Sequence, residues 1–324
     1  MKVSIRLAVR DWDYVTPLLL GDVASERIDL KIERLATLPE DFASDPRFDA
    51  SEISFSRYTT ARSRGETAVL GVPNFLMRGF RHRCIITARD SGLVRLEGLR
   101  GKRIGVTGWQ DSGNTWTRAA LARAGVGIDD ARWYAGRLTE AHPVTDRLGR
   151  YAHPGRIEPV PGERPMLELL DEGWLDAVFT PFMPPGFFER QTRYRLLLPD
   201  VRAAERAYFE AVGYVPGIHV LGIKAAFAAQ HPWAVQELSD LIDAARRLWL
   251  EKRRKYIDTT PWLIEDLVST GRDLPPDWDA SGLGANRHMI ADFLDEVRRQ
   301  GLADTGLTPE SLFPSIAELA GEPA

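Results

Sequence analysis

The chain has 324 residues, which is longer than a single hydrophobic core usually supports, so two domains are expected. Its net charge of −4 and the absence of a long basic stripe argue against a nucleic-acid surface. No apolar run is long enough to span a bilayer and no signal-peptide pattern is visible, so we expect no membrane partner and a cytoplasmic location. Cys84 is the only cysteine, which excludes disulfides within the chain and thiolate metal clusters.

The first part of the chain alternates predicted strands with predicted helices. This alternation favours an α/β fold with mostly parallel strands. Strands are predicted at Val3–Val9, Ile28–Arg34, Phe48–Phe55, Thr67–Pro73 and Arg83–Ala88, and helices at Tyr14–Leu20 and Ser56–Arg64.

A second series of alternating elements starts near Ser91. The stretch Leu138–Arg164 is rich in proline, glycine and charge, and is interpreted as a long loop with at most one strand. Strands are predicted at Arg103–Thr107, Ala131–Tyr134, Arg156–Val160, Asp176–Thr180 and Tyr194–Leu198, and helices at Thr115–Ala124 and Pro165–Glu172.

After a further predicted strand, Gly217–Ala225, the chain becomes helical to its end. A chain that leaves one lobe near residue 88 and returns near residue 200 has two crossing segments, which form a hinge. We therefore expect lobe one to comprise residues 1–88 and 200–324 and lobe two residues 89–199, with the ligand cleft between them. The predicted terminal helices are Pro232–Lys255, Pro261–Ser269, Arg287–Gln300 and Pro309–Leu312.

The stretch 98–124 indicates an anion-binding site. A strand that ends at Thr107 leads through the loop Gly108–Gly113 into a helix that ends at Gly125. Unpaired N–H groups at a helix start, together with the helix dipole, favour a carboxylate or a phosphate. Candidate binding residues around this start are Thr107, Ser112, Asn114 and Thr115, of which Ser112 or Asn114 is equally suited to capping the helix, and Trp109, which suits stacking on an aromatic ring.

Six segments, in this order along the chain, resemble the 4,5-dihydroxyphthalate decarboxylase family. The resemblance implies a type 2 periplasmic-binding-protein-like fold and removal of one carboxylate from a dihydroxylated aromatic diacid. The segments Thr139–Arg164 and the tail after Leu302 depart from the family pattern. The six segments are FDASEISFSRYTTARSRG (48–65), GFRHRCIITARDSGL (79–93), LRGKRIGVTGWQDSGNTWTRAAL (99–121), GWLDAVFTPFMPP (173–185), HPWAV (231–235) and GLGANRHMIADFL (282–294).

Such a decarboxylation requires groups that hold carboxylates and an acid that protonates the ring carbon. Arg81 and His82 are the first candidates: Arg81 as a bidentate carboxylate clamp and His82 as the proton donor. The alternative is that Arg81 pairs with an acid of the protein and that His82 caps a turn.

A second group of candidates follows the third predicted strand. Ser54 and Ser56 are expected to reach the cleft, and Glu52 shares their strand face by period-two alternation. Glu52 is either a base for the phenol or a partner of a nearby arginine. His219 is a second candidate acid or base, although a lone histidine in an apolar strand is more often part of a core. Residues at other strand ends are further candidates for substrate contact: Arg10, Asp11, Phe179 and Pro181.

No histidine or acidic spacing predicts a metal site, and the chemistry requires no organic cofactor; a divalent ion held by carboxylates and the substrate stays open. The expected partner is a small aromatic carboxylate, and self-association is possible. Two other functions suit the same scaffold: a solute-binding protein for a small carboxylate, and another lyase. The first of these lacks a visible export signal or anchor, since Cys84 lies far from the start.

Overall fold

The structure is a computed structural model that describes residues 2–304 and 306–314. The chain forms two compact units: unit 1 comprises Met1–Arg78, Gly217–Ala291 and Gly306–Ala324, and unit 2 comprises Gly79–Pro216 and Asp292–Thr305. The predicted boundaries near residues 88 and 200 both lie within unit 2, and part of the expected C-terminal tail groups with unit 2 as well. Residues 1, 305 and 315–324, which the predicted lobes include, lie outside the described residues.

Unit 1 contains a five-stranded sheet with the order β2-β1-β3-β11-β4. β1 pairs in parallel with β2 and β3, whereas β11 runs antiparallel to β3 and β4, so the expectation of mostly parallel strands holds only on one side of this sheet. The strands are β1 (Val3–Val9), β2 (Ile28–Arg34), β3 (Ala50–Ser54), β4 (Val69–Arg78) and β11 (Gly217–Lys224).

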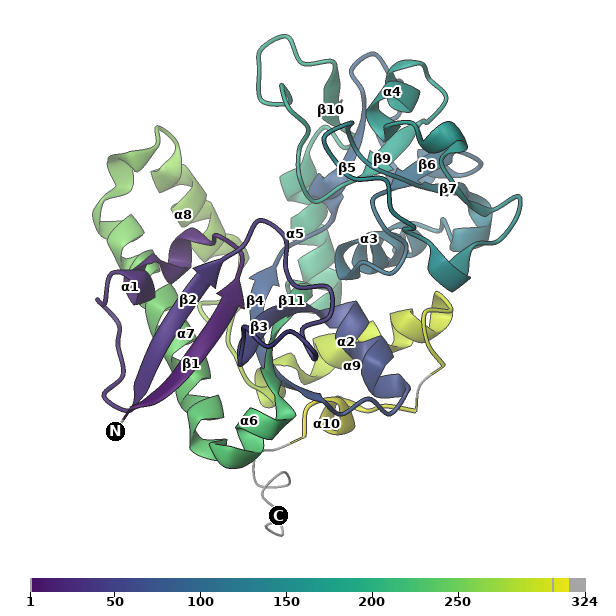
Figure 1. Cartoon of the computed structure of the whole chain (residues 1–324). Coiled ribbons are helices and arrows are strands. Elements are labelled where there is room, and N and C mark those ends of the chain that lie inside the picture. The colour runs from purple at the N-terminus through teal and green to yellow at the C-terminus, as the bar shows by residue number, and fades with distance from the viewer. Residues whose placement is uncertain (1, 305, 315–324) are drawn as a thin grey trace. The chain divides into compact units, whose positions relative to one another are not determined.

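The core of unit 1 is formed by the sheet and the long helix α7 (Pro232–Lys255), which runs behind β1 and β2 in Figure 1. Leu7 of β1 and Leu238 and Ile242 of α7 are buried in one apolar cluster. The opposite side of the sheet packs against α2 (Phe55–Ser63), whose Phe55 meets Phe75 of β4 edge to face. The sheet is therefore covered by helices on both faces.

Unit 2 contains a six-stranded sheet with the order β10-β5-β9-β6-β7-β8. The run β9-β6-β7-β8 is parallel, and β5 and β10 are antiparallel to their neighbours. The predicted loop 138–164 contains a single strand, β8, as expected. The strands are β5 (Ile85–Ala88), β6 (Arg103–Val106), β7 (Arg132–Ala135), β8 (Ile157–Pro159), β9 (Ala177–Phe179) and β10 (Tyr194–Leu196).

Helix α4 (Met166–Asp171) packs closely on this second sheet because β6 carries a glycine at the contact. A Cβ atom at Gly105 would lie 2.8 Å from the Sδ atom of Met166, so any larger side chain would push α4 outward. Helix α3 (Ser112–Arg123) follows β6 and ends before Gly125, which has a positive φ of 78°. This confirms the predicted strand, loop and helix of the stretch 98–124.

The sequence reasoning missed two helices, α5 (Val201–Val212) and α6 (Ala225–Gln230). α5 begins at an N-cap, Asp200, whose carboxylate accepts a hydrogen bond from the N–H of Ala203 at 2.9 Å, and it ends at Gly213 with a left-handed backbone. These two signals were present in the sequence. The other helices are α1 (Thr16–Leu19), α8 (Leu263–Asp273), α9 (Leu283–Arg299) and α10 (Pro309–Leu312).

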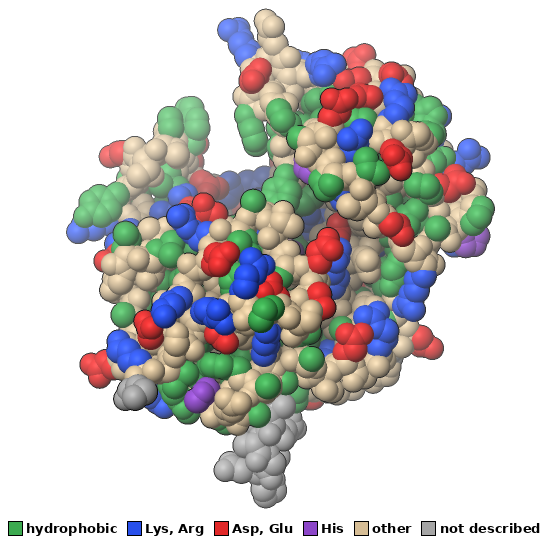
Figure 2. All heavy atoms as spheres, in the orientation of Figure 1, with side chains coloured by type: hydrophobic (Ala, Val, Ile, Leu, Met, Phe, Trp, Pro, Cys, Tyr) green, Lys and Arg blue, Asp and Glu red, His purple; other side chains and the backbone are tan. Residues whose placement is uncertain are grey.

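The surface carries mixed charge. Acidic and basic side chains are interspersed on the face drawn in Figure 2. Within the described ranges, no helix combines the length and the apolar character that crossing a membrane requires. The fold is thus two α/β units, each with a mixed sheet between helices.

Candidate active site

Several polar candidates of unit 1 gather at one edge of its sheet. β1 and β3 are parallel, so their carboxyl ends meet at the same edge, and the antiparallel β11 begins there. Arg10 and Asp11 follow β1, Ser54 ends β3, and His219 lies opposite Ser54 in the β11–β3 register. The sequence reasoning placed Arg10, Asp11 and Ser54 at strand ends and His219 within an apolar strand, and the topology brings all four to one edge.

Glu52 and His219 form a buried pair at this edge. The Glu52 side chain is fully buried, and its Oε1 lies 2.5 Å from Nδ1 of His219. Its other oxygen accepts hydrogen bonds from the backbone N–H of Arg10 at 3.0 Å and from the indole N–H of Trp12 at 2.8 Å. Three donors therefore fix the carboxylate, which leaves it to orient His219 rather than to reach a substrate.

The His219 imidazole is held by one nitrogen only. Its side chain is 15% exposed, and its one hydrogen bond within the described part of the chain joins Nδ1 to Glu52. The pairing of β11 with β4 shifts register on both sides of His219, an irregularity of the kind that re-aims a side chain. A carboxylate on Nδ1 fixes the ring and leaves Nε2 to exchange a proton.

The other unit 1 candidates have structural contacts of their own. The guanidinium of Arg10 donates to the carbonyl of Ala36 at 2.9 Å, and Asp11, at the surface, pairs with Arg34 at 2.7 Å. Ser54 caps α2 by accepting a weak hydrogen bond of 3.4 Å from the N–H of Arg57. Ser56 lies in the first turn of α2 and is fully buried.

In unit 2, Arg81 is a buried cation beside the start of α3. It is only 4% exposed, and its Nε and Nη2 have no hydrogen-bond partner among the described residues. A Cβ atom at Gly113 would lie 2.8 Å from Nη2, so the guanidinium rests against the first turn of α3. Both features are electropositive, and burial lowers the pKa of Arg81. A bound anion that contacts the guanidinium would supply the partner that its Nε and Nη2 lack.

Two more arginines strengthen this positive region. Arg118 of α3 is buried, donates from Nη2 to the carbonyl of Trp109 at 2.7 Å, and lies over that indole ring. Burial lowers the pKa of Arg118 to about 9 and also lowers that of Arg147. Asp111 is a carboxylate that acts electrostatically on both, as it does on Arg81. Asp111 is thus shared by the three guanidinium groups of Arg81, Arg118 and Arg147. Because positive charge exceeds negative charge here, the region favours a bound anion.

His82 follows Arg81 and is also buried. It is 5% exposed, its Nδ1 has no hydrogen-bond partner within the described ranges, and its ring meets Tyr208 edge-on at 5.3 Å. Burial lowers the pKa of His82, although Glu205 opposes this effect. Glu205 itself is paired with Arg83 and does not hold the His82 ring as Glu52 holds His219.

The polar residues around the start of α3 mainly fasten its loop. Asn114 donates to the carbonyl of Gly108 at 2.7 Å, and Thr115 donates to the carbonyl of Asp111 at 3.1 Å. The N-cap position is Asp111, so the suggested capping by Ser112 or Asn114 is wrong. Thr107 accepts a longer hydrogen bond of 3.2 Å from Asn114. Ser112, Asn114 and Thr115 are all buried, so a ligand reaches this turn only when the covering groups move.

The aromatic candidates of unit 2 lie in its core. Trp109 is 1% exposed, with Arg118 over its ring at 4.0 Å and Trp133 against its edge. Phe179 is fully buried and also packs on Trp133. These positions leave no free ring face, which argues against the predicted stacking of Trp109 on a substrate. Pro181, two residues after β9, is partly buried.

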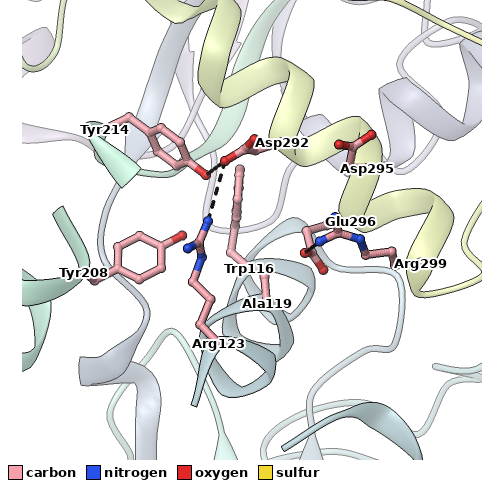
Figure 3. A pocket seen from close by; sticks show the side chains of 9 residues that line it. All are labelled: Trp116, Ala119, Arg123, Tyr208, Tyr214, Asp292, Asp295, Glu296 and Arg299. Carbon is pink, nitrogen blue, oxygen red and sulfur yellow. Dashed lines mark hydrogen bonds and ion pairs between the residues drawn. The ribbon is translucent and has the colours of Figure 1, made fainter. Parts of the chain in front are cut away.

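A small cavity of about 90 Å³ lies elsewhere in unit 2. Figure 3 shows Tyr214 directed toward Asp292, and its hydroxyl donates to that carboxylate at 2.7 Å. Arg123 pairs with the same carboxylate at 3.8 Å, and Arg299 pairs with Glu296. Because these charges are paired within unit 2, the cavity has the character of a structural polar network.

Metal ligands do not cluster in the described residues: no group of three or more His, Cys, Asp or Glu side chains is placed to hold an ion.

Two functional features escaped the sequence reasoning. Trp12 carries an indole N–H to Glu52, and its signal was its place directly after the strand-end pair Arg10 and Asp11. Arg118 is a buried charge of α3, and its signal was its place directly before the apolar run 119–122.

Comparison with characterised proteins gives two curated relatives. A 4,5-dihydroxyphthalate decarboxylase of Comamonas testosteroni is 27% identical over 319 residues, covering 96% of this chain and 96% of the relative. The chain resembles 4,5-dihydroxyphthalate decarboxylases. A second protein of that name, from Pseudomonas putida, is 29% identical over 217 residues, covering 66% of this chain and 84% of the relative. No protein-family model matches the chain. The resemblance predicted from sequence is thus confirmed, and both relatives are named as carboxy-lyases.

Solved structures support the predicted fold. The desulfurization enzyme DSZB aligns with a TM-score of 0.54 at 15% identity, covering 98% of this chain and 99% of that chain. The alkanesulfonate-binding protein SsuA of Xanthomonas axonopodis pv. citri, bound to MOPS, aligns with a TM-score of 0.54 at 14% identity, covering 96% and 98%. The periplasmic-binding-protein-like fold expected for this chain is therefore confirmed. Because one neighbour is an enzyme and the other a binding protein, the fold alone does not decide between these functions.

Proposed function

We propose that the protein decarboxylates a hydroxylated aromatic dicarboxylic acid such as 4,5-dihydroxyphthalate. The similarity to two decarboxylases over most of the chain supports the reaction class. The structural observation that carries the proposal is the buried guanidinium of Arg81 against the first turn of α3, whose Nε and Nη2 have no hydrogen-bond partner in the described part of the chain. A planar carboxylate matches the fork of an arginine, and the N–H groups of a helix start add further donors.

The proposed reaction replaces one carboxylate by a proton. The hydroxyl para to that carboxylate loses its proton to solvent, and electron density moves into the ring. An acid then protonates the carbon that bears the carboxylate, which gives a transient dienone. The carbon–carbon bond breaks, its electron pair returns to the ring, and carbon dioxide leaves. The electron sink is the substrate's own ring, so the proposal needs no organic cofactor.

We assign the acid to His219 rather than to His82, which the sequence favoured. Glu52 fixes Nδ1 of His219 at 2.5 Å, so Nε2 is the nitrogen that transfers the proton. Burial lowers the pKa of His82, which favours its neutral form and makes it a less suitable proton donor. In this assignment Arg81 binds, Glu52 positions and His219 donates.

The test is incubation of the full-length protein with a panel of mono- and dihydroxylated phthalates and benzoates. Mass spectrometry records the loss of carbon dioxide, and dialysis against a chelator before the assay tests the need for a metal. We expect turnover of a dihydroxyphthalate in both preparations, with little turnover of the monoacids. Tight binding of a diacid without any product would overturn the proposal in favour of a solute-binding protein.

A further inference from the structure

Trp12 lies beside the acid–base pair of unit 1 and joins it through one hydrogen bond. Its indole N–H donates to Oε2 of Glu52 at 2.8 Å, while Oε1 of the same carboxylate contacts His219. The carboxylate is fully buried, so water does not compete for these oxygens. The backbone N–H of Arg10 is the other donor to Oε2, and no side-chain substitution removes it.

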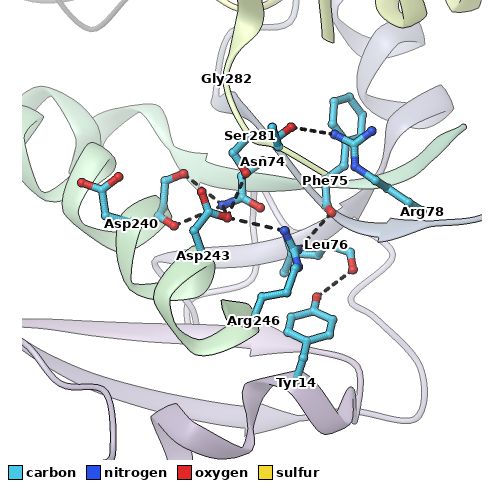
Figure 4. A network of polar contacts seen from close by, with 12 residues as sticks. Tyr14, Asn74, Phe75, Leu76, Arg78, Asp240, Asp243, Arg246, Ser281 and Gly282 are labelled. Carbon is cyan, nitrogen blue, oxygen red and sulfur yellow. Dashed lines mark hydrogen bonds and ion pairs between the residues drawn. The ribbon is translucent and has the colours of Figure 1, made fainter. Parts of the chain in front are cut away.

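The indole ring is itself held in place by a buried network. It stacks on Tyr14 with nearly parallel planes, 8° apart, and the Tyr14 hydroxyl donates to the carbonyl of Leu76 at 2.7 Å. Arg246 of α7 lies over the Tyr14 ring and donates to the carbonyl of Phe75 at 3.2 Å. Figure 4 shows this arrangement, in which Arg246 lies between Tyr14 and the carboxylate of Asp243. Trp12 is therefore backed by groups from β4 and α7.

This geometry gives the indole N–H a defined task. With two donors on Oε2, the Glu52 carboxylate has one preferred plane, and that plane directs Oε1 at the imidazole. With one donor, the carboxylate can rotate about its terminal bond, for which several angles are accessible. The imidazole would then lose the fixed partner that sets its orientation.

We infer that Trp12 is a positioning residue, which holds the Glu52 carboxylate in the orientation that aligns His219. The expected effect on turnover rests on the proposed function, whereas the expected effect on the orientation of the His219 ring does not. Trp12 acts through Glu52 and needs no contact with the substrate. The change that isolates this role is Trp12→Phe, which keeps an aromatic ring on Tyr14 and removes only the N–H.

The first measurement is independent of catalysis. In the ¹⁵N-labelled full chain, the imidazole nitrogens of His219 are assigned by their loss in His219→Gln, and the Trp12 indole signal by its loss in Trp12→Phe. We expect Glu52→Gln to shift the Trp12 indole signal and Trp12→Phe to shift the Nδ1 signal of His219. Trp233→Phe is the matched control, since Trp233 packs under Arg27 in the same unit and has no hydrogen bond to Glu52. Wild-type nitrogen shifts for His219 in Trp12→Phe would overturn the inference.

The second measurement is a double-mutant cycle on turnover. Trp12→Phe should lower kcat roughly tenfold with KM changed less than about twofold, the size expected for one hydrogen bond to a charged group. In a Glu52→Gln background the same change should cost little more, because the residue it acts through is already altered. Additive losses would contradict a role through Glu52. If no substrate is turned over, the proposed function fails, whereas the nitrogen shifts still decide the role of Trp12.

Discussion

The two candidate histidines lie in opposite electrostatic surroundings. His219 of unit 1 has a carboxylate on Nδ1, and that carboxylate has all its neighbours in place. His82 of unit 2 has no partner on Nδ1 among the described residues and lies beside Arg81, whose guanidinium is also unsatisfied. The hydrogen bonds of the Glu52 carboxylate in unit 1 need no ligand, whereas Arg81 and His82 in unit 2 have buried nitrogen atoms without a partner among the described residues. A buried polar group without a partner costs free energy, so unit 2 gains most from a bound anion.

This contrast separates two tasks that sequence alone assigned to neighbouring residues. A satisfied carboxylate–imidazole pair suits proton transfer, because its geometry does not depend on the ligand. An unsatisfied buried guanidinium suits binding, because the ligand supplies what it lacks. The following changes test this division, beginning with the one of largest expected effect.

Replacement of the two histidines by glutamine should separate proton transfer from packing. We expect His219→Gln to lower kcat roughly 1,000-fold, within the range for loss of a general acid, and His82→Gln to lower it less than about tenfold. Initial rates of carbon dioxide release on saturating dihydroxyphthalate would measure both. If His82→Gln proves the more damaging change, the acid belongs to unit 2 and the assignment made from the sequence is restored.

Replacement of Arg81 should weaken binding without unfolding the protein. Arg81→Met removes two charge-assisted hydrogen bonds to a carboxylate and should raise the dissociation constant of a phthalate about 100-fold by calorimetry. Arg81→Lys keeps the charge but not the fork, and should recover only part of the loss.

The same variant has an unusual expected effect on stability. Because no carboxylate of residues 2–304 and 306–314 is bonded to the guanidinium, Arg81→Met removes a buried unpaired charge, and the free energy of unfolding should stay equal or rise. Urea unfolding of both proteins measures this. A marked loss of stability would show that Arg81 is bonded to the protein in solution, which would remove the basis of the anion site.

Local sequence pattern predicted most of the elements and placed several unit 1 candidates at strand ends. Strand alternation located β1 and β3, and the residues after a strand end are those that reach the sheet edge. What pattern did not predict was the partner of each side chain. Glu52 and His219 are 167 residues apart, so their contact depends on the antiparallel insertion of β11 beside β3. In its own segment, His219 is an isolated polar residue in an apolar strand.

Trp109 illustrates the opposite failure. Its place in the loop before α3 suggested stacking on an aromatic ligand, but Arg118 and Trp133, from other elements, enclose it. A loop residue is buried or exposed according to what packs on the loop, which is long-range information. Gly113, by contrast, has no side chain to attract notice, yet its missing Cβ makes room for the guanidinium of Arg81.

Adding a methyl group at Gly113 should weaken phthalate binding, but less than the replacement of Arg81 does. Gly113→Ala places a Cβ at 2.8 Å from Nη2 of Arg81 and must displace the guanidinium from the first turn of α3. We expect roughly tenfold weaker phthalate binding, which corresponds to about 1.4 kcal/mol. Gly92→Ala, where a Cβ meets nothing within 4 Å, is the matched control and should bind as the native protein does. Equal affinity for Gly113→Ala would place the bound carboxylate away from this turn.

The smallest expected effect is on stability in mild acid. Burial lowers the pKa of His82, so below about pH 6.5 the unfolded chain binds a proton on this imidazole before the folded protein does. Stability from this group is therefore fully present above pH 6.5 and is lost as the pH falls. His82→Phe removes the effect. Relative to the native protein, its free energy of unfolding should rise by up to about 1 kcal/mol between pH 7.5 and pH 5.5.

Urea unfolding at the two pH values measures this difference, and any constant cost of the new ring cancels in it. His153→Phe is the control, since His153 is an exposed histidine of the same unit and should give no pH-dependent difference. A His82→Phe protein whose relative stability does not change with pH would mean that the folded protein takes up the proton at His82 as readily as the unfolded chain. His82 would then have an unrecognised partner for its charged form, and it would no longer differ from His219, which has the Glu52 carboxylate on its Nδ1.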